Sequence, residues 1–368
     1  MAALTPAVRW LGVPVAIACS VPLFLLPARA NTGAPTTVPS AAPEVPPITG
    51  PVLQIAPTGD DARGNGTVAA PFRTVTAALA TQPAPGTVLQ LAAGTYTAEA
   101  GEQFPLRIPA GVKLVGNPET QGQGVVVSGG GAFVSPTFAR QNVGVLLGSG
   151  ATLSGVTVTN ANPRGYGLWV ESGKDVEIYR NTFVGSAHDG VFLTGETSAL
   201  VRDNLFRGNK ANGLSAVGTS KGEILGNTFE NTGYGLAIGQ RSTVRVANNQ
   251  IVKNRSGIVI SNLAQPVLRN NLIADHAEDG VVILRDRRGE PKPDLGTAAD
   301  PGKNVFRNNK RRDIDNASGI VQTAIGNELD ARKVAGTFDP PMPKPPASTP
   351  TRPPAPAPAR PSAPAPRR

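Results

Sequence analysis

The sequence contains a single cysteine, Cys19, among its 368 residues. It lies in an apolar stretch, Trp10–Pro27, which follows the basic Arg9 and ends at the small-residue sequence Ala28-Arg29-Ala30. Such a segment is typical of a secretory signal peptide, so we expect a mature chain with no cysteine and no disulfide. Lipidation of Cys19 is an alternative, but the apolar residues that follow it disfavour this modification.

The sequence also lacks an uninterrupted apolar run long enough to cross a bilayer. A transmembrane helix needs about 20 predominantly apolar residues. Pro14, Pro22 and Pro27 interrupt the N-terminal stretch well before that length. We therefore expect no transmembrane anchor after signal cleavage. The protein is expected to be secreted or to reside in the periplasm or cell envelope.

Composition divides the chain into four segments. Residues 1–30 are the signal peptide, 31–50 are a spacer rich in Pro, Thr and Ala, and 51–335 are the folded domain. Residues 336–368 form a basic tail rich in Pro and Ala. Such a composition cannot bury a core, so we expect the tail to be extended or disordered.

The formal charge of +9 is concentrated near the C-terminus. From Arg332 onward Asp339 is the only acidic residue, against seven basic ones: Arg332, Lys333, Lys344, Arg352, Arg360, Arg367 and Arg368. The folded middle is therefore almost neutral, which makes nucleic acid a poor partner for an exported chain. The tail is either a solvated linker or a tether to an anionic envelope polymer, such as cell-wall polymer or lipopolysaccharide.

Two sequence markers repeat every 22–23 residues. A glycine that precedes alternating apolar residues recurs at Gly167, Gly190, Gly213, Gly235, Gly257 and Gly280. An asparagine two residues before a large apolar residue recurs at Asn181, Asn204, Asn227, Asn249 and Asn271. Short runs with period-2 alternation, separated by Gly, Asn and Asp, indicate strands. The unit is too short for a βαβ crossover, and it lacks the leucine frame and helix of leucine-rich repeats.

The repeat predicts an all-β fold, a right-handed parallel β-helix in which each unit forms one coil of a single-stranded solenoid. Neighbouring coils pair at about 4.8 Å, so residues in equal register stack. We expect interior ladders that start at Leu168, Val170 and Phe183, and an amide ladder of the repeated asparagines at a turn.

A solenoid needs its open ends covered. Thr74 is a plausible cap for a short N-terminal helix in which Val75, Ala78 and Leu79 share one face. We predict that this capping helix is the lid on the first coil.

Several segments resemble a family of known fold. They are Gly59–Gly64, Ala70–Val75, Ala93–Tyr96, Gly101–Leu106 and Leu114–Gly116. These residues are similar to the start of pectin-lyase-like β-helices in an uncharacterised bacterial family, DUF1565. Asp294–Gly296 and Gly302–Phe306 resemble the closing coil of the same proteins. The resemblance covers about residues 50–330.

This resemblance implies a secreted protein that most often meets polysaccharide, but it does not specify an activity. The wider superfamily includes lyases, hydrolases, esterases, epimerases, adhesins and inactive binders. The galacturonase Asn-Thr-Asp is missing, as are the methylesterase Asp-Phe-Ile-Phe-Gly and the epimerase Asp-Pro-His. The only adjacent aspartates are Asp60 and Asp61.

No two carboxylates share a register position on neighbouring coils, as a calcium-assisted lyase would require. We therefore expect no metal and no cofactor. The outer charges are instead expected to pair, Arg180 with Asp203 and Arg207 with Glu230, at a few tenths of a kcal/mol to about 1 kcal/mol each.

One polar group is a candidate site. Tyr166, Asp189 and Asn212 share a register position, and His188 lies beside Arg164 and Lys210. In a catalytic site, His188 would act as base with Tyr166 or Asp189 as proton partner. Arg164 or Lys210 would neutralise a uronate, and Asn212 would contact substrate. The alternative is structural, because the coil turns here and turns collect Asp, Asn and His. The other histidine, His276, has no comparable neighbours and is expected on the surface.

A second candidate is aromatic. Trp169 and Phe192 alternate with inward residues, so both should point outward on adjacent coils. An exposed pair would bind the flat faces of sugar rings. The alternative is that a loop, such as the N-terminal spacer, covers them, because the same register position continues as a semi-apolar row: Ser215, Ala237, Val259 and Val282.

These features predict an exported β-helix protein that binds polysaccharide without catalysis. A carbohydrate-active enzyme centred on His188, a metal-independent lyase or hydrolase of an anionic glycan, is the alternative. It would require a groove over the coils of residues 164–212. A structural or adhesin-like spacer is the third possibility. The pattern specifies neither the glycan nor the oligomeric state.

Overall fold

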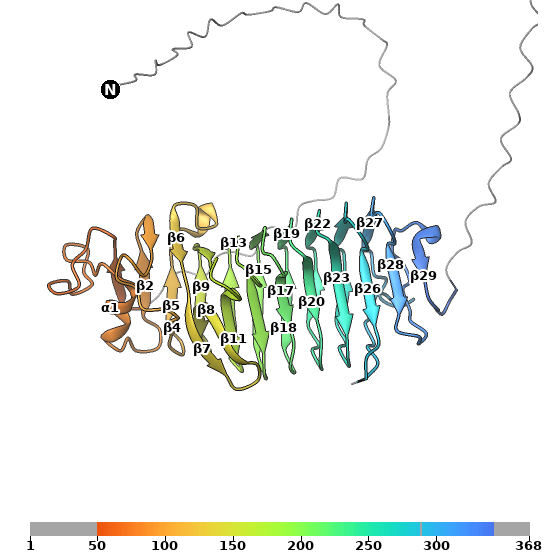
Figure 1. Ribbon diagram of the computed structural model, residues 1–368, viewed down its shortest axis with the longest axis horizontal. Helices are drawn as coiled ribbons and strands as arrows, with labels where there is room; N and C mark the ends of the chain where they lie inside the picture. The colour runs from red at the N-terminus through yellow and green to blue at the C-terminus, as the bar shows by residue number, and fades with distance from the viewer. Residues whose placement is uncertain (1–49, 288, 342–368) are drawn as a thin grey trace, which may run out of the picture. The chain divides into compact units, whose positions relative to one another are not determined.

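The computed structural model describes residues 50–287 and 289–341 (Figure 1). The predicted signal peptide with Cys19, nearly all of the spacer and the tail from Met342 onward lie outside the described residues. Within these ranges, no helix is long and apolar enough to cross a membrane. The described β-structure runs from Val52 to Ala335.

Three sheets run along the solenoid, and each complete coil contributes one strand to each of them (Figure 1). Sheet A contains β1 (Val52–Ile55), β2 (Val88–Leu91), β5 (Lys113–Val115), β9 (Thr152–Ser154), β12 (Val176–Tyr179), β15 (Ser198–Arg202), β18 (Lys221–Leu225), β21 (Arg245–Ala247) and β24 (Val267–Arg269). Sheet B contains β3 (Gly94–Tyr96), β6 (Val125–Ser128), β10 (Thr157–Thr159), β13 (Thr182–Val184), β16 (Leu205–Arg207), β19 (Thr228–Glu230), β22 (Gln250–Val252), β25 (Leu272–Ala274) and β27 (Val305–Arg307).

Sheet C is the longest, with 11 strands. Its parallel path contains β4 (Leu106–Ile108), β8 (Ala139–Leu147), β11 (Gly165–Glu171), β14 (Val191–Thr194), β17 (Asn212–Ala216), β20 (Tyr234–Ile238), β23 (Ser256–Ser261), β26 (Val281–Leu284), β28 (Ile314–Ala317) and β29 (Val334–Ala335). The remaining strand, β7 (Gly131–Ser135), lies off this path and pairs antiparallel with β8. The predicted parallel β-helix is therefore confirmed.

The interior ladders have the predicted register. Leu168 pairs with Val191, and Val191 pairs with Leu214, so equal positions of successive coils stack inside the solenoid. Phe183, Phe206 and Phe229 are fully buried, and their rings stack with centroids 5.1 and 4.5 Å apart. Burial of these apolar rows supplies the main driving force for folding, at about 25 cal/mol per Å².

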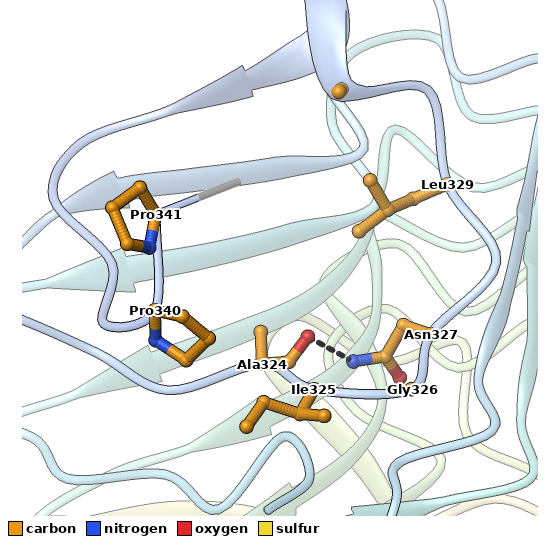
Figure 2. Close-up of a pocket in the computed structure, with 8 residues that line it drawn as sticks. Ala324, Ile325, Gly326, Asn327, Leu329, Pro340 and Pro341 are labelled. Atoms are coloured by element: carbon orange, nitrogen blue, oxygen red, sulfur yellow. Dashed lines mark hydrogen bonds between the residues drawn. The ribbon is translucent and has the colours of Figure 1, made fainter. Parts of the chain in front are cut away.

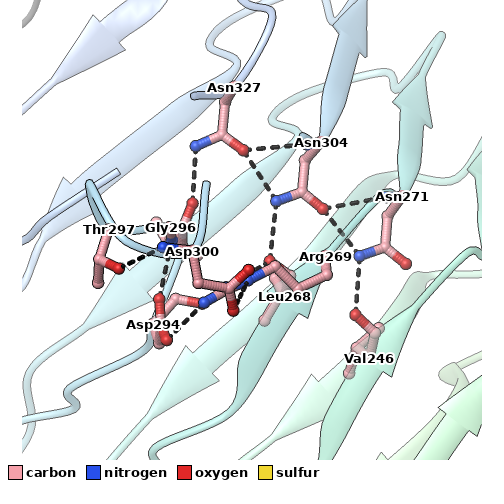
Figure 3. A network of polar contacts seen from close by, with 11 residues as sticks. Val246, Leu268, Arg269, Asn271, Asp294, Gly296, Thr297, Asp300, Asn304 and Asn327 are labelled. Carbon is pink, nitrogen blue, oxygen red and sulfur yellow. Dashed lines mark hydrogen bonds and ion pairs between the residues drawn. The ribbon is translucent and has the colours of Figure 1, made fainter. Parts of the chain in front are cut away.

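The asparagine ladder at the turn between sheets A and B is also confirmed. Nδ2 of Asn181 donates to Oδ1 of Asn204 at 3.1 Å, and the same bond repeats down the solenoid. Figure 3 shows that the ladder extends beyond the predicted set through Asn304 and Asn327. The residue before several of these asparagines is left-handed, such as Asp203 at φ 56°. The amide thus satisfies backbone groups that this sharp turn leaves without strand partners.

A second polar ladder follows the turn between sheets B and C. The backbone N–H of Ser186 donates to Oδ1 of Asn209 at 3.0 Å, and that of Thr232 donates to Oδ1 of Asn254 at 2.9 Å. His276 occupies the next rung and is fully buried. The prediction of a surface histidine was therefore wrong. The sequence signal was present, because positions 209, 232, 254 and 276 keep the 22–23-residue period.

The short helix α1 (Val75–Ala80) forms where the sequence predicted it. The hydroxyl of Thr74 accepts the N–H of Ala77 at 3.0 Å, and the carboxylate of Glu102 accepts the N–H of Val75 at 2.7 Å. Val75 and Ala78 are buried, and the helix packs against β1 and β4. Its role as a lid on the first coil remains a prediction.

The outer charges follow the predicted pairing only in part. Arg207 does pair with Glu230. Arg180 instead reaches Glu119 at 3.4 Å in the 3-10 turn η1 (Pro118–Thr120), and Asp203 pairs with its neighbour Arg202 at 3.1 Å. The prediction for Arg180 was wrong because residues 117–123, outside the regular repeat, pack over this corner of the solenoid.

Candidate functional site

The candidate site lies at the corner where each coil passes from sheet B to sheet C. We call this edge of the solenoid the B–C corner, formed by residues 160–164, 185–190, 208–211, 231–233, 253–255, 275–280 and 308–313. His188 and Asp189 stand just before β14, between the coils that contain Tyr166 and Asn212. Backbone bonds fix this stacking, because the N–H of His188 donates to the Gly165 carbonyl and that of Ala211 donates to the His188 carbonyl.

Asp189 is the centre of a buried hydrogen-bond network. It is fully buried, and its Oδ1 lies 2.8 Å from Nδ1 of His188. Ser215 donates its hydroxyl to Oδ2 at 2.6 Å, while the backbone and side-chain amides of Asn212 reach Oδ1 at 3.2 and 3.1 Å. A carboxylate with this many donors is fixed in place and orients the imidazole ring of His188.

Tyr166 covers the other side of His188. The two rings stack with centroids 4.4 Å apart, and the phenol oxygen lies 3.5 Å from Nε2 of His188. Burial, followed by the nearby charge of Asp189, raises the pKa of Tyr166. The phenol therefore stays protonated at neutral pH and serves as a hydrogen-bond donor rather than a base.

The structure brings four of the predicted residues into contact and leaves the two cations at the rim. Arg164 is exposed and donates to Oε1 of Gln141 at 3.3 Å. Lys210 is also exposed, on the coil after His188. Sequence reasoning missed Ser215, which was grouped with Trp169 as part of an apolar row. Its hydroxyl instead donates a hydrogen bond to Asp189 on the preceding coil. The repeat pattern of the sequence does not show such a side-chain contact between coils.

The predicted aromatic pair is stacked but buried. Trp169 and Phe192 have ring centroids 4.2 Å apart and planes 18° apart. Trp169 is 0% exposed and Phe192 6%, so the pair is covered in this structure, and sugar binding by the pair remains a prediction. The cover is the hairpin of β7 and the start of β8, which places Phe133 and Phe138 edge-on against Trp169. The N-terminal spacer, which was the suggested cover, lies outside the described residues.

A cavity of about 310 Å³ lies elsewhere, near the C-terminal end of the described chain (Figure 2). Its only polar side chain is Asn327, whose Nδ2 already donates to the carbonyls of Leu295 and Ala324. This cavity therefore offers apolar volume without reactive groups. In the part of the chain that the structure describes, no three His, Asp or Glu side chains are grouped to hold a metal ion.

Comparison with known proteins places the chain in a family. A family model described as a protein of unknown function, DUF1565, matches residues 57–334. The protein belongs to DUF1565. No curated protein matches the sequence.

Solved structures share the fold of this DUF1565 protein at low sequence identity. The pectate lyase Pel9A has a TM-score of 0.50 at 16% identity, over 77% of this chain and 79% of that chain. A GH136 lacto-N-biosidase from Eubacterium ramulus has a TM-score of 0.50 at 12% identity, over 78% of this chain and 66% of that chain. At such identities the likeness shows a β-helix fold shared with polysaccharide-acting enzymes, and an activity has to be argued from the site.

Exposed cations recur along the B–C corner of this DUF1565 protein. They are Arg164, Lys210, Lys253, Arg255, Lys310, Arg311 and Arg312. Of the acidic residues in the same corner, Asp189, Asp279 and Asp313 are buried, Asp275 is exposed and Glu278 is half-buried. Three of the cations form ion pairs: Arg255 with Glu278, Arg311 with Asp279 and Arg312 with Asp315. The corner thus presents more exposed cations than exposed carboxylates to solvent.

Proposed function

We propose that this DUF1565 protein binds an acidic polysaccharide along the B–C corner without catalysing its cleavage. The observation that carries the proposal is the row of exposed cations at that corner, on coils whose spacing is about 4.8 Å. A polymer with regularly spaced carboxylates or sulfates can contact several of these cations at once. Summed over many contacts, such weak attractions give useful affinity and fast association.

The chemistry of the His188 group favours binding over proton transfer. Its buried carboxylate, Asp189, is saturated with donors, and its phenol, Tyr166, is kept protonated by burial. These groups hold the imidazole in one orientation at the surface. His188 can therefore hydrogen-bond a hydroxyl or carboxylate of a bound sugar.

The proposal includes a location. The N-terminal stretch of the sequence is typical of a signal peptide, which supports export to the cell envelope or the extracellular space. There the partner would be an anionic polysaccharide or envelope polymer.

The test is calorimetric titration of the purified protein with polygalacturonate and alginate, with neutral galactan as control. We expect saturable binding of the acidic polymers that weakens between 50 and 300 mM salt, because screening grows as the Debye length shortens. Equal binding of galactan, or no binding of any acidic polymer, would overturn the proposal. Absorbance of unsaturated uronates and new reducing ends are followed in the same samples.

One observation favours a second candidate, a polysaccharide lyase or hydrolase. The contact between Nδ1 of His188 and the carboxylate of Asp189 resembles the carboxylate–imidazole pairing that orients a general base, and the other ring nitrogen, Nε2, faces the phenol of Tyr166. Turnover of an acidic polymer that is lost in His188→Ala would establish this candidate in place of the first. Turnover that persists in His188→Ala would exclude His188 as the base.

A further inference from the structure

The aromatic cluster on the outer face of sheet C lies apart from the solenoid core. It contains Val143, Leu146, Tyr166, Trp169 and Phe192, with Phe133 and Phe138 packed against it. The chain has only 17 aromatic residues, of which five are gathered here around a single stacked pair. Tyr166 joins this cluster to the His188 group, because its ring stacks on His188 and stands edge-on to Trp169 with centroids 5.0 Å apart.

The segment that covers the cluster is a strand hairpin outside the solenoid ladder. We call residues 131–141 the strap. Its first strand, β7, pairs with β8 and lies off the parallel path of sheet C. The pairing of β8 with β11 uses Asn142 to Leu146, beyond the strap. Lifting the strap would therefore break no rung between coils, and the solenoid would keep its full ladder.

One carboxylate holds the tip of the strap. Glu171, at the end of β11, accepts a hydrogen bond from Ser135 at 2.5 Å and from Thr137 at 2.9 Å. It also accepts the indole N–H of Trp169 at 3.0 Å. Thr137 in turn lies 3.2 Å from the hydroxyl of Thr194 on the next coil. We call these hydrogen bonds of Glu171 with Ser135 and Thr137 the latch, because they hold the tip of the strap.

The base of the strap is held by a residue of the candidate site. Gln141 donates to the Phe138 carbonyl, and its Oε1 accepts from Arg164 at 3.3 Å. This last bond is long, and its acceptor is a neutral amide oxygen. A carboxylate is a stronger partner for a guanidinium, because the hydrogen bond is then assisted by charge on both sides. An acidic saccharide at the B–C corner would therefore compete with Gln141 for Arg164.

We propose that the strap is a lid over a sugar-binding platform, and that an acidic saccharide opens it. The carboxylate of the saccharide takes Arg164 from Gln141, the strap lifts, and a sugar ring packs against the uncovered side of the stacked pair Trp169 and Phe192 beside His188. Flat apolar sugar faces pack well on indole and phenyl rings. The inference rests on the proposed binding of acidic polysaccharide, and it adds the platform, the lid and the role of Arg164.

The test locks the lid chemically. A full-length chain with Trp10→Phe and Cys19→Ser has Trp169 as its only tryptophan and no cysteine. Thr137→Cys and Thr194→Cys then replace two threonines whose hydroxyl oxygens are 3.2 Å apart in the native structure. This separation is short enough for the two new thiols to be joined as a disulfide. Binding of tri-galacturonate and acrylamide quenching of Trp169 fluorescence are measured for the oxidised and the reduced protein, with Thr137→Cys alone as control.

We expect the reduced protein to bind tri-galacturonate at least tenfold more tightly than the oxidised protein. Trp169 should also become more accessible to acrylamide when the saccharide is added to the reduced form alone. Equal binding in both redox states would overturn the lid and leave the proposed polysaccharide binding intact. Absence of binding in both states and in the control would overturn both proposals.

A second variant tests the latch without cysteines. Glu171→Gln keeps the size of the side chain but weakens its hydrogen bonds to Ser135 and Thr137. In the Trp10→Phe chain it should raise the quenching constant of Trp169 severalfold in the absence of saccharide. Unchanged quenching in this variant, both without and with tri-galacturonate, would show that the strap is a fixed part of the fold and would overturn the inference.

Discussion

The backbone N–H of Asn254 donates to Nδ1 of the buried His276 on the next coil at 3.1 Å. This contact requires a neutral imidazole whose Nδ1 is an acceptor. Burial lowers the pKa of His276 to about 4, from its ordinary value of 6.5. The histidine therefore replaces an asparagine in a structural ladder, and it makes that ladder sensitive to acid.

We predict that the free energy of unfolding falls by about 3 kcal/mol as the pH decreases from 7 to 4 because of His276. Between pH 6.5 and 4 the unfolded chain binds a proton at this residue and the folded chain does not, so acid favours unfolding. Urea denaturation at both pH values measures the difference. His276→Asn is the matched control, because asparagine occupies the flanking rungs, and it should remove this part of the pH dependence. A variant with the wild-type pH dependence would contradict the assignment.

Asn227, in the middle of the first ladder, should be among the most sensitive polar residues. Its Oδ1 accepts both amides of Asn204, and its Nδ2 donates to the Val201 carbonyl. Asn227→Ala would leave these buried groups without partners, at a cost of about 3 kcal/mol in the free energy of unfolding. The exposed Gln250→Ala should change it by less than about 0.5 kcal/mol. Comparable losses in the two variants, measured by urea denaturation, would refute a special role for the ladder.

The phenylalanine stack should respond to the volume of its central residue. Phe206 is fully buried between Phe183 and Phe229. Phe206→Ala should lower the free energy of unfolding by about 3–5 kcal/mol, because the rigid coils on either side cannot close the cavity. Phe206→Leu should cost clearly less, since it retains most of the volume. Thermal and urea unfolding of the two variants provide the comparison, and equal losses would show that the coils collapse around the site.

Lys210 should contribute to binding of acidic polysaccharide through its charge. Lys210→Gln is expected to weaken binding of polygalacturonate about fivefold, close to 1 kcal/mol for an exposed ion pair. Lys221→Gln removes an exposed cation from β18 on sheet A, away from the B–C corner, and should leave the affinity unchanged. Calorimetric titration at one salt concentration distinguishes the two. If both variants bind polygalacturonate equally more weakly, the polymer is attracted by the net charge of the protein and does not bind at the B–C corner specifically.

The repeat in the sequence determined most of the solenoid. Parallel coils pair in register, so residues 22–23 positions apart must stack, and alternation tells which of them face inward. For this reason the rows through Leu168, Val170 and Phe183 and the ladder through Asn181 could be predicted residue by residue. The same spacing also applies to His276, but its place in the ladder becomes clear only from the hydrogen bonds that it makes with the neighbouring coils.

Only the tertiary structure decided the contacts made by segments outside the repeat. The strap has no counterpart in neighbouring coils, so nothing in the period indicated that it would cover Trp169. Residues 117–123 likewise redirected Arg180 to Glu119. At the candidate site, the sequence placed His188, Asp189 and Asn212 together, because register governs them. The ring of Tyr166 on His188 and the hydroxyl of Ser215 on Asp189 depend on side-chain directions between coils, which packing determines and periodicity does not.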